Sequence, residues 1–254
     1  MVSIIINCDD FGLSESTNLM IREALGAGLI SSTTLMANMR GFEHAIDLAR
    51  RSEVFKNRVG VHVNLTEGTP LTDAIRSEPR FCTQGGDFHA GIPRPSLRFT
   101  AQERLAVALE VRAQIRRIVD HGIDLTHLDG HHHIHTEPAV MQSILPEMTR
   151  FSIGRVRISR NLGVDSNVFK RAYKFAFRGG LRIAGLQTAD YFGEIQDVPL
   201  IGRSARADSV IELMVHVVGR DGAGQILDYD RRPISSKIRE HLPDRVDLVS
   251  YGEI

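Results

Sequence analysis

Short apolar runs alternate with longer amphipathic segments along most of this chain. The apolar runs are typical of buried strands, and the amphipathic segments repeat their apolar residues at helical spacing. Predicted strands are 3–7, 29–38, 59–66, 125–135 (running into a loop), 155–159, 210–218 and 246–252. Predicted helices are 14–28, 41–51, 100–122, 138–148, 167–180 and 235–242. This alternation predicts βα units with parallel strands and helices outside the sheet.

The number of βα units bears on how the sheet closes. Six or seven units in a chain of 254 residues fit a closed or nearly closed barrel better than an open sheet. We therefore predict a single α/β domain over residues 1–254, a TIM-like βα barrel, complete, distorted or incomplete. Residues 67–99 contain Gly, Pro and Ser with little periodicity, which indicates an irregular loop. That loop is either a flap over a site or an ordinary surface insertion.

The composition limits the kinds of molecule that the protein is expected to bind and the compartment in which it is expected to work. The chain has 31 basic and 31 acidic residues, so charge gives no indication of nucleic-acid or membrane-surface binding. It contains no apolar run long enough for a membrane span, and its N-terminus lacks the features of a signal peptide. The two cysteines, Cys8 and Cys82, make no disulfide framework. We expect a cytoplasmic protein, and a homo-oligomer is compatible with the sequence.

The stretch VGVHVNLT, residues 59–66, alternates between an apolar and a polar face. Its polar positions are Gly60, His62, Asn64 and Thr66. In a βα barrel one strand face meets the helices and the other faces the interior, and barrel enzymes place their sites at the C-terminal strand ends. His62 is therefore a candidate site residue, although a hydrogen-bonded core histidine is the simpler explanation of this residue alone.

The stretch THLDGHHHIH, residues 126–135, is unusually rich in histidine. If the strand continues through it, one face carries His127, Asp129, His131, His133 and His135. Neutral imidazole is the commonest protein ligand for borderline divalent metals. The stretch therefore indicates a metal site, with adventitious metal binding as the alternative.

A third signal is the pair Asp9 and Asp10, directly after a hydrophobic strand. Adjacent carboxylates repel each other unless a cation or hydrogen-bond donors compensate, whereas a turn that ends at Gly12 would explain them without a site. Two histidines and one carboxylate from the ends of different strands suit a catalytic zinc or similar ion with open positions. The second carboxylate could act as a base on water.

These blocks carry a family resemblance. NCDDFGLSES, STTLMANM, VGVHVNLTEGTPL, THLDGHHHIH and ELMVH resemble, in this order, the blocks of YdjC-like carbohydrate deacetylases, which include chitooligosaccharide deacetylases. The resemblance covers most of the chain. It implies a TIM-like or distorted barrel, one divalent metal ion, and hydrolysis of N-acetyl groups on the acetamido sugars of an oligosaccharide or polysaccharide.

The resemblance also implies roles for single residues. The metal ligands would be Asp10, His62 and His131, with zinc as the first candidate ion and magnesium or nickel as alternatives. Asp9 would be the general base and His216 a proton donor. Arg157 would bind substrate or orient a carboxylate.

The remaining polar residues of the histidine-rich stretch support these roles. Asp129 and His127 precede His131 and are candidates to hydrogen-bond a ligating imidazole. His133 and His135 would line the cleft, and a solvent-exposed polar loop is the alternative for all four residues.

Two departures from the family pattern leave rival functions open. The chain reads HVVGRDG where the family has His-Pro-Gly after the last block, and residues 67–99 match poorly. One rival is another metal-dependent enzyme on the same ligands, such as a non-haem iron oxygenase, although those usually adopt a jelly roll. The other rival is a barrel that binds sugar or metal without turnover.

Overall fold

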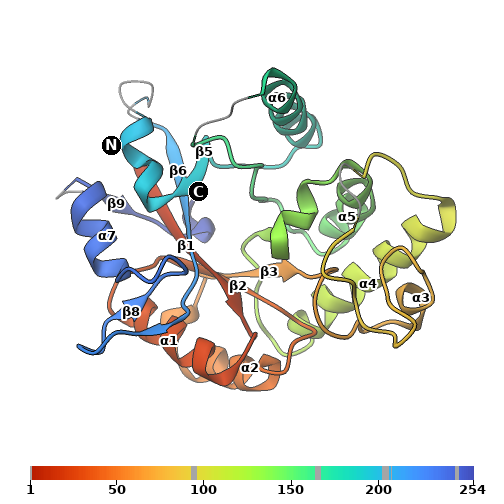
Figure 1. Ribbon diagram of the computed structural model, residues 1–254, viewed down its shortest axis with the longest axis horizontal. Coiled ribbons are helices and arrows are strands. Elements are labelled where there is room, and N and C mark those ends of the chain that lie inside the picture. Colours follow the sequence, from red (N-terminus) through yellow and green to blue (C-terminus); the bar gives the residue numbers. More distant parts are fainter. Residues whose placement is uncertain (1, 93–95, 164–166, 202–205, 207, 244–245) are drawn as a thin grey trace.

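A curled parallel sheet occupies the centre of the protein in this computed structural model, which describes residues 2–92, 96–163, 167–201, 206, 208–243 and 246–254 (Figure 1). Its strands follow the order β4-β3-β2-β1-β6-β5, and β9 pairs with the start of β1. The strands are β1 Ser3–Phe11, β2 Ser32–Leu35, β3 Val59–Val63, β4 Leu128–Gly130, β5 Tyr191–Glu194, β6 Val210–Val215 and β9 Asp247–Leu248. A separate antiparallel hairpin joins β7 Gly219–Arg220 to β8 Ile226–Leu227.

The sheet curls into a half-barrel. Beyond β4, Leu128 forms a single parallel bridge with Val156. At the other edge, the backbone N–H groups of Asn161 and Leu162 donate to the carbonyl of Phe192 in β5. The segment between these contacts therefore runs from one edge of the sheet towards the other. The described strands support a distorted α/β barrel, and they do not form a complete TIM barrel.

Helices surround the sheet, as predicted for βα units (Figure 1). They are α1 Glu15–Gly26, α2 Phe42–Arg51, α3 Asp73–Arg76, α4 Ala101–Val119, α5 Pro138–Arg150, α6 Val168–Ile183 and α7 Ile234–His241. Short 3₁₀ helices are η1 Glu53–Phe55, η2 His131–Thr136, η3 Ile195–Leu200 and η5 Tyr251–Glu253. In α4, Thr100 and Glu103 form a reciprocal capping box. Across the described ranges, no helix has the length and apolarity needed to cross a membrane.

Six of the seven predicted strands are shorter than expected, whereas the first extends through Asp9 and Asp10 to Phe11. Residues 155–159 contribute only isolated bridges, and the last predicted strand shrinks to β9 followed by η5. The predicted strand 125–135 ends at Gly130, because His132 and His133 take left-handed φ angles of 51° and 55°. The expected two-face alternation through His135 is therefore wrong beyond Gly130.

The segment 67–99 packs against α4 over its described part. Phe81, Phe88 and Phe99 are buried there. The Glu110 carboxylate of α4 accepts hydrogen bonds from the backbone N–H groups of Leu71 and Thr72. Residues 93–95 lie outside the described part of the chain. The role of this segment as a flap stays a prediction.

Candidate metal centre

The end of β1 turns its two aspartates in different directions. The pairing of β1 with β2 shifts register between Cys8 and Phe11, and Asp10 within this bulge has a φ of 68°. A left-handed conformation is uncommon for residues other than glycine, and aspartate is among those that tolerate it best. As a result, Asp10 faces His62 and His131, whereas Asp9 faces Arg157.

His62 is held by β3 with both ring nitrogens engaged. Its Nδ1 lies 2.6 Å from Oδ1 of Asp129, and its Nε2 lies 3.3 Å from Oδ1 of Asp10. Thr34 of β2 adds a contact of 3.1 Å to the same Nδ1. A proton on Nδ1, donated to Asp129, leaves the Nε2 lone pair directed at Asp10, which is the tautomer that a metal ligand requires.

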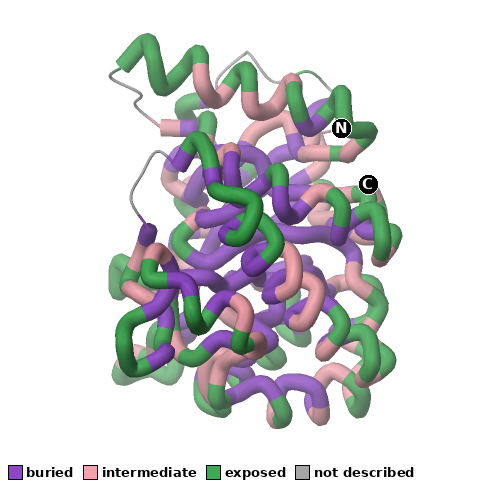
Figure 2. Tube along the Cα trace, turned by 90° about the vertical axis from the view of Figure 1, so that its right-hand side faces the viewer, coloured by how far each residue is buried: buried purple, intermediate pink, exposed green. Residues whose placement is uncertain are grey.

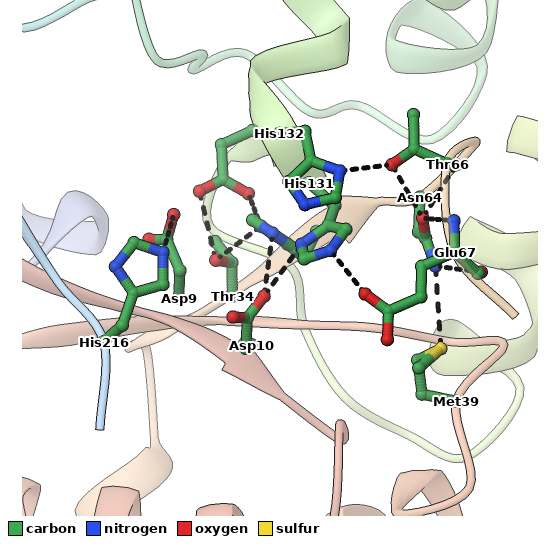
Figure 3. A network of polar contacts seen from close by, with 12 residues as sticks. Asp9, Asp10, Thr34, Met39, Asn64, Thr66, Glu67, His131, His132 and His216 are labelled. Atoms are coloured by element: carbon green, nitrogen blue, oxygen red, sulfur yellow. Dashed lines mark hydrogen bonds and ion pairs between the residues drawn. The ribbon is translucent and has the colours of Figure 1, made fainter. Parts of the chain in front are cut away.

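His131, at the start of η2, also has both ring nitrogens engaged, but here Nδ1 rather than Nε2 faces Asp10. Its Nδ1 lies 3.0 Å from Oδ1 of Asp10, and its Nε2 lies 3.0 Å from Oε2 of Glu67 (Figure 3). Glu67 reaches His131 because the Asn64 side chain organises the turn after β3. Oδ1 of Asn64 accepts from the N–H groups of Thr66 and Glu67. Each candidate ligand imidazole thus has its own carboxylate partner.

Asp10, His62 and His131 form a set that could hold a metal ion. One ligand atom from each lies within 4.8 Å of the other two. The donor set of one carboxylate and two imidazoles, each imidazole oriented by a second carboxylate, fits a zinc or similar divalent ion. The negative charge around His62 also favours a cation at this position. Although burial lowers it, the Asp129, Asp10 and Asp9 carboxylates raise the pKa of His62 to about 10.

Arg157 lies fully buried among three carboxylates. Its guanidinium forms a two-pronged pair with Asp9 at 2.7 Å, and it contacts Asp129 at 2.7 Å and Glu212 at 2.6 Å. Burial opposes ionisation of Asp9, yet Arg157 holds the pKa of Asp9 well below its usual range. Burial raises the pKa of Glu212 to about 7, and the Tyr251 hydroxyl donates to Glu212. Asp9 is therefore ionised and fixed in orientation.

His216 follows β6 directly and stands beside Asp9. Its Nε2 lies 3.8 Å from Oδ2 of Asp9, and its backbone N–H donates to the Asp228 carboxylate. Asp228 in turn pairs with the buried ammonium of Lys237 in α7. The loop that follows β6 is therefore anchored to α7 through a buried ion pair.

The other predicted residues surround this set, and among them Asp129 contacts it directly. His127 shares the inward face with Asp129, but it stacks on Tyr251 at 3.7 Å between ring centroids and contacts Thr126. Asp129 hydrogen-bonds a candidate ligand imidazole, that of His62. His135 is buried and contacts the Arg157 carbonyl. His133 packs edge-on against Phe192, and burial, reinforced by Arg157, lowers its pKa to about 3.

Three residues of the site were not predicted. They are Glu67, Thr34 and Glu212. A signal existed for Glu212, since it is the only charged residue within the apolar run VIELMV. Glu67 could have been found in the block that carries His62, because both stand within the same resemblance to the family.

Comparison with known proteins assigns the chain to a family. The family model described as YdjC-like protein matches residues 3–238. The chain belongs to the YdjC-like family. Among similar proteins, a carbohydrate deacetylase of Brevibacillus brevis is 40% identical over 150 residues, which is 57% of this chain and 54% of that protein. A carbohydrate deacetylase of Geobacillus stearothermophilus is 38% identical over 158 residues, 61% of this chain and 60% of that protein.

These alignments span little more than half the length of the two relatives. A solved structure extends the likeness of fold over the whole chain. It is that of an Enterococcus faecalis protein whose name proposes cellobiose-phosphate cleavage, with a TM-score of 0.71 and 19% identity. It covers 99% of this chain and 98% of that one. At this identity the likeness concerns the fold alone, and it agrees with the distorted barrel described above.

Proposed function

We propose that this protein is a metal-dependent carbohydrate deacetylase that hydrolyses the N-acetyl group of acetamido sugars. The observation that carries the proposal is the convergence of Asp10, His62 and His131 at the strand ends, beside His216 and the ionised Asp9. The family relatives named carbohydrate deacetylases supply the reaction class.

Asp10, His62 and His131 would hold one divalent ion, with zinc as the first candidate. When bound, the ion supplies Lewis acidity towards water and the acetamide carbonyl. Asp129 and Glu67 keep the two imidazoles in the ligating tautomer by accepting their second N–H groups.

Asp9 would take the proton of the attacking water. Arg157 occupies one lone pair on each Asp9 oxygen, which leaves Oδ2 able to accept a further proton on the side of His216. The low pKa keeps Asp9 ionised throughout the physiological range, so it is ready to accept.

His216 would deliver a proton to the departing amine nitrogen. An amine is a poor leaving group, so its expulsion requires an acid, and His216 is partly exposed next to the base. The hydrogen bond from its backbone to Asp228 fixes the residue at the end of β6.

A cleft next to His133 would bind the sugar. It has a volume of about 760 Å³, and its lining includes Leu97, His133, Arg160, Phe169 and Tyr173. Aromatic faces and polar side chains together suit a saccharide, whose rings have apolar C–H faces and polar rims. Part of this cleft belongs to the poorly matching segment 67–99, where substrate preference would be decided.

The test is an acetate-release screen over N-acetylated monosaccharides and oligosaccharides, with and without chelator. We expect release from at least one acetamido sugar, abolished by chelation and restored by one divalent metal. Sugar binding without acetate release under all metals would instead favour a non-catalytic barrel. The iron-oxygenase alternative is disfavoured, because the chain has an α/β fold rather than a jelly roll.

A further inference from the structure

The orientation of the proposed base, Asp9, depends on Arg157. Oδ1 of Asp9 accepts hydrogen bonds from the Asn7 side chain at 2.9 Å and from Nη2 of Arg157 at 2.7 Å. Oδ2, the oxygen beside His216, accepts from Nη1 of Arg157 at 2.7 Å. The direction in which Oδ2 points is therefore set by the position of Nη1.

Nη1 of Arg157 is shared between two carboxylates. It lies 2.7 Å from Oδ2 of Asp9 and 2.7 Å from Oδ2 of Asp129. Asp129 also holds Nδ1 of His62 at 2.6 Å. A guanidinium that shifted towards Asp129 would therefore move away from the base. Both partners lie at the Nη end of this rigid, planar group, so a partner at its Nε end limits such a shift.

Glu212 of β6 provides the contact at the Nε end. Nε of Arg157 donates to Oε1 of Glu212 at 2.6 Å, and both side chains are fully buried. Figure 2 shows the buried parts of the chain gathered in the interior of the molecule, and β6 is buried beyond Val210. Because β6 pairs with β1 on one side and β5 on the other, the backbone that carries Glu212 is fixed.

Tyr251 of η5 holds the second oxygen of Glu212. Its hydroxyl donates to Oε2 of Glu212. The ring of Tyr251 is fully buried and stacks on His127, with 3.7 Å between ring centroids. η5 is itself packed closely, since a Cβ at Gly252 would lie 2.6 Å from the Asn57 carbonyl oxygen. A continuous series of buried hydrogen bonds therefore runs from η5 through Glu212 to Arg157 and the base.

Neutralisation of Arg157 does not explain why Glu212 is present. Asp9 and Asp129 already place two carboxylates against one guanidinium. A third carboxylate adds negative charge to a buried site, and burial raises the pKa of Glu212 to about 7. The hydrogen bonds of Glu212, rather than its charge, are therefore the feature that matters for Arg157.

We propose that Glu212 and Tyr251 are positioning residues of the active site, which hold the base Asp9 in place through Arg157. This inference rests on the proposed function, because it assigns both residues to the step in which water is activated. A residue that only stabilises the fold would lower the free energy of unfolding and leave turnover unchanged. Loss of a positioning residue instead lowers kcat and leaves KM unchanged.

Steady-state kinetics of acetate release test the proposal, with N-acetylated chitooligosaccharides as the first substrates. Glu212→Leu removes the contact at Nε. We expect kcat to fall about a hundredfold with KM and bound zinc unchanged, since a misplacement of about 1 Å has an effect of this size. Tyr251→Phe removes one hydroxyl and should lower kcat about tenfold. Glu212→Gln keeps both hydrogen bonds, so its turnover should be close to that of wild type.

Glu147→Leu is the matched control. Glu147 is another buried carboxylate, and it forms a two-pronged pair with Arg112 between α4 and α5. Its loss should lower the free energy of unfolding and leave kcat unchanged. Tyr251→Phe deletes a single oxygen atom, and it decides the question if Glu212→Leu does not fold. Wild-type turnover in Tyr251→Phe, or equally low turnover in Glu212→Gln and Glu212→Leu, would overturn the proposal.

The guanidinium gives a second readout that does not use acetate release. The Nε–H signal of Arg157 in a nitrogen-15 magnetic resonance spectrum can be assigned by its loss in Arg157→Lys. This signal should shift in Glu212→Leu and stay in place in Glu147→Leu. An unchanged signal in Glu212→Leu would overturn the proposal. If the wild type releases no acetate while the signal shifts as expected, the proposed function fails and the anchoring of Arg157 by Glu212 is supported.

Discussion

At the scale of single residues, Asp10 shows how a strained position can support a site. A left-handed φ in a residue other than glycine costs ~1–3 kcal/mol, and it persists only where the surroundings determine it. Here the strain turns Asp10 towards His62 and His131 and frees Asp9 to meet Arg157. Two adjacent carboxylates can therefore perform different tasks.

Replacing His216 tests the proton donor. For His216→Ala we expect turnover to fall by ~10²–10⁴, because the amine leaves without an acid, while metal content is unchanged. Acetate release and bound-metal analysis measure the two quantities. His241→Ala, at the end of α7, is the matched control and should behave as wild type. Full turnover in His216→Ala would disprove the assignment.

Replacing Glu67 tests the orientation of His131. The Glu67 side chain is 46% exposed, so for Glu67→Gln we expect metal affinity to fall by about tenfold, the lower end of what such partners contribute. Metal titration of chelated protein gives the affinity. Glu53→Gln, at an exposed glutamate of η1, should leave it unchanged. Equal affinities for the wild type and Glu67→Gln would contradict the role.

At the scale of elements, β3 and β4 meet closely because Gly60 has no side chain. A Cβ at Gly60 would lie 2.5 Å from the His127 ring and 2.8 Å from the His127 carbonyl oxygen. The backbone oxygen cannot move aside without disturbing the pairing of the two strands. This close contact allows His127 to stack on Tyr251 inside the half-barrel.

Gly60→Ala should therefore destabilise the fold. We expect a loss of ~1–3 kcal/mol in the free energy of unfolding, as for other overpacked cores. Chemical denaturation provides the measurement. Gly26→Ala, where an added Cβ meets nothing within 4 Å, should be neutral or slightly stabilising. A Gly60→Ala protein as stable as wild type would show that β3 and β4 can separate freely.

Elements whose hydrophobic pattern is continuous were predictable from the sequence. The strand that carries Asp9, the strand that carries His62 and the capped helix after Thr100 all form where local pattern requires them. The prediction for residues 131–135 failed because strand alternation assumes an extended backbone, and His132 and His133 are left-handed.

The candidate site was predictable only in part, for a related reason. Asp10 and His62 lie near the C-terminal ends of β1 and β3, and His131 directly follows β4, so parallel pairing brings them to one edge of the sheet. The positions of the residues that contact these side chains depend on tertiary structure instead. Glu67 reaches His131 only through the turn made by Asn64, and Arg157 enters from a segment that forms a single bridge with the sheet.

At the scale of the whole molecule, buried charge makes stability depend on pH and on metal. Without an ion, the carboxylates around His62 raise its pKa from 6.5 to about 10, against the effect of burial. Between these two values the folded protein binds more protons than the unfolded chain. Stability from this group is complete below pH 6.5 and is lost as pH rises through about 10.

Chelated protein should accordingly melt at lower temperatures as pH rises from 6.5 to 10. Protein loaded with zinc should not follow this decline, because the ion replaces the proton and binds deprotonated ligands better. Thermal unfolding across this pH range, with chelator or with zinc, measures both curves. Parallel curves would contradict a metal site at His62, and His62→Gln should remove most of the decline in chelated protein.

The most direct test of the account is acetate release as a function of ions bound per chain, in protein first stripped by chelation. We predict that activity is absent without metal, rises in proportion to occupancy and saturates at one ion per chain, and that Asp10→Ala and His131→Ala lose both binding and activity. Acetate release by fully stripped protein, or full activity in either variant, would contradict it.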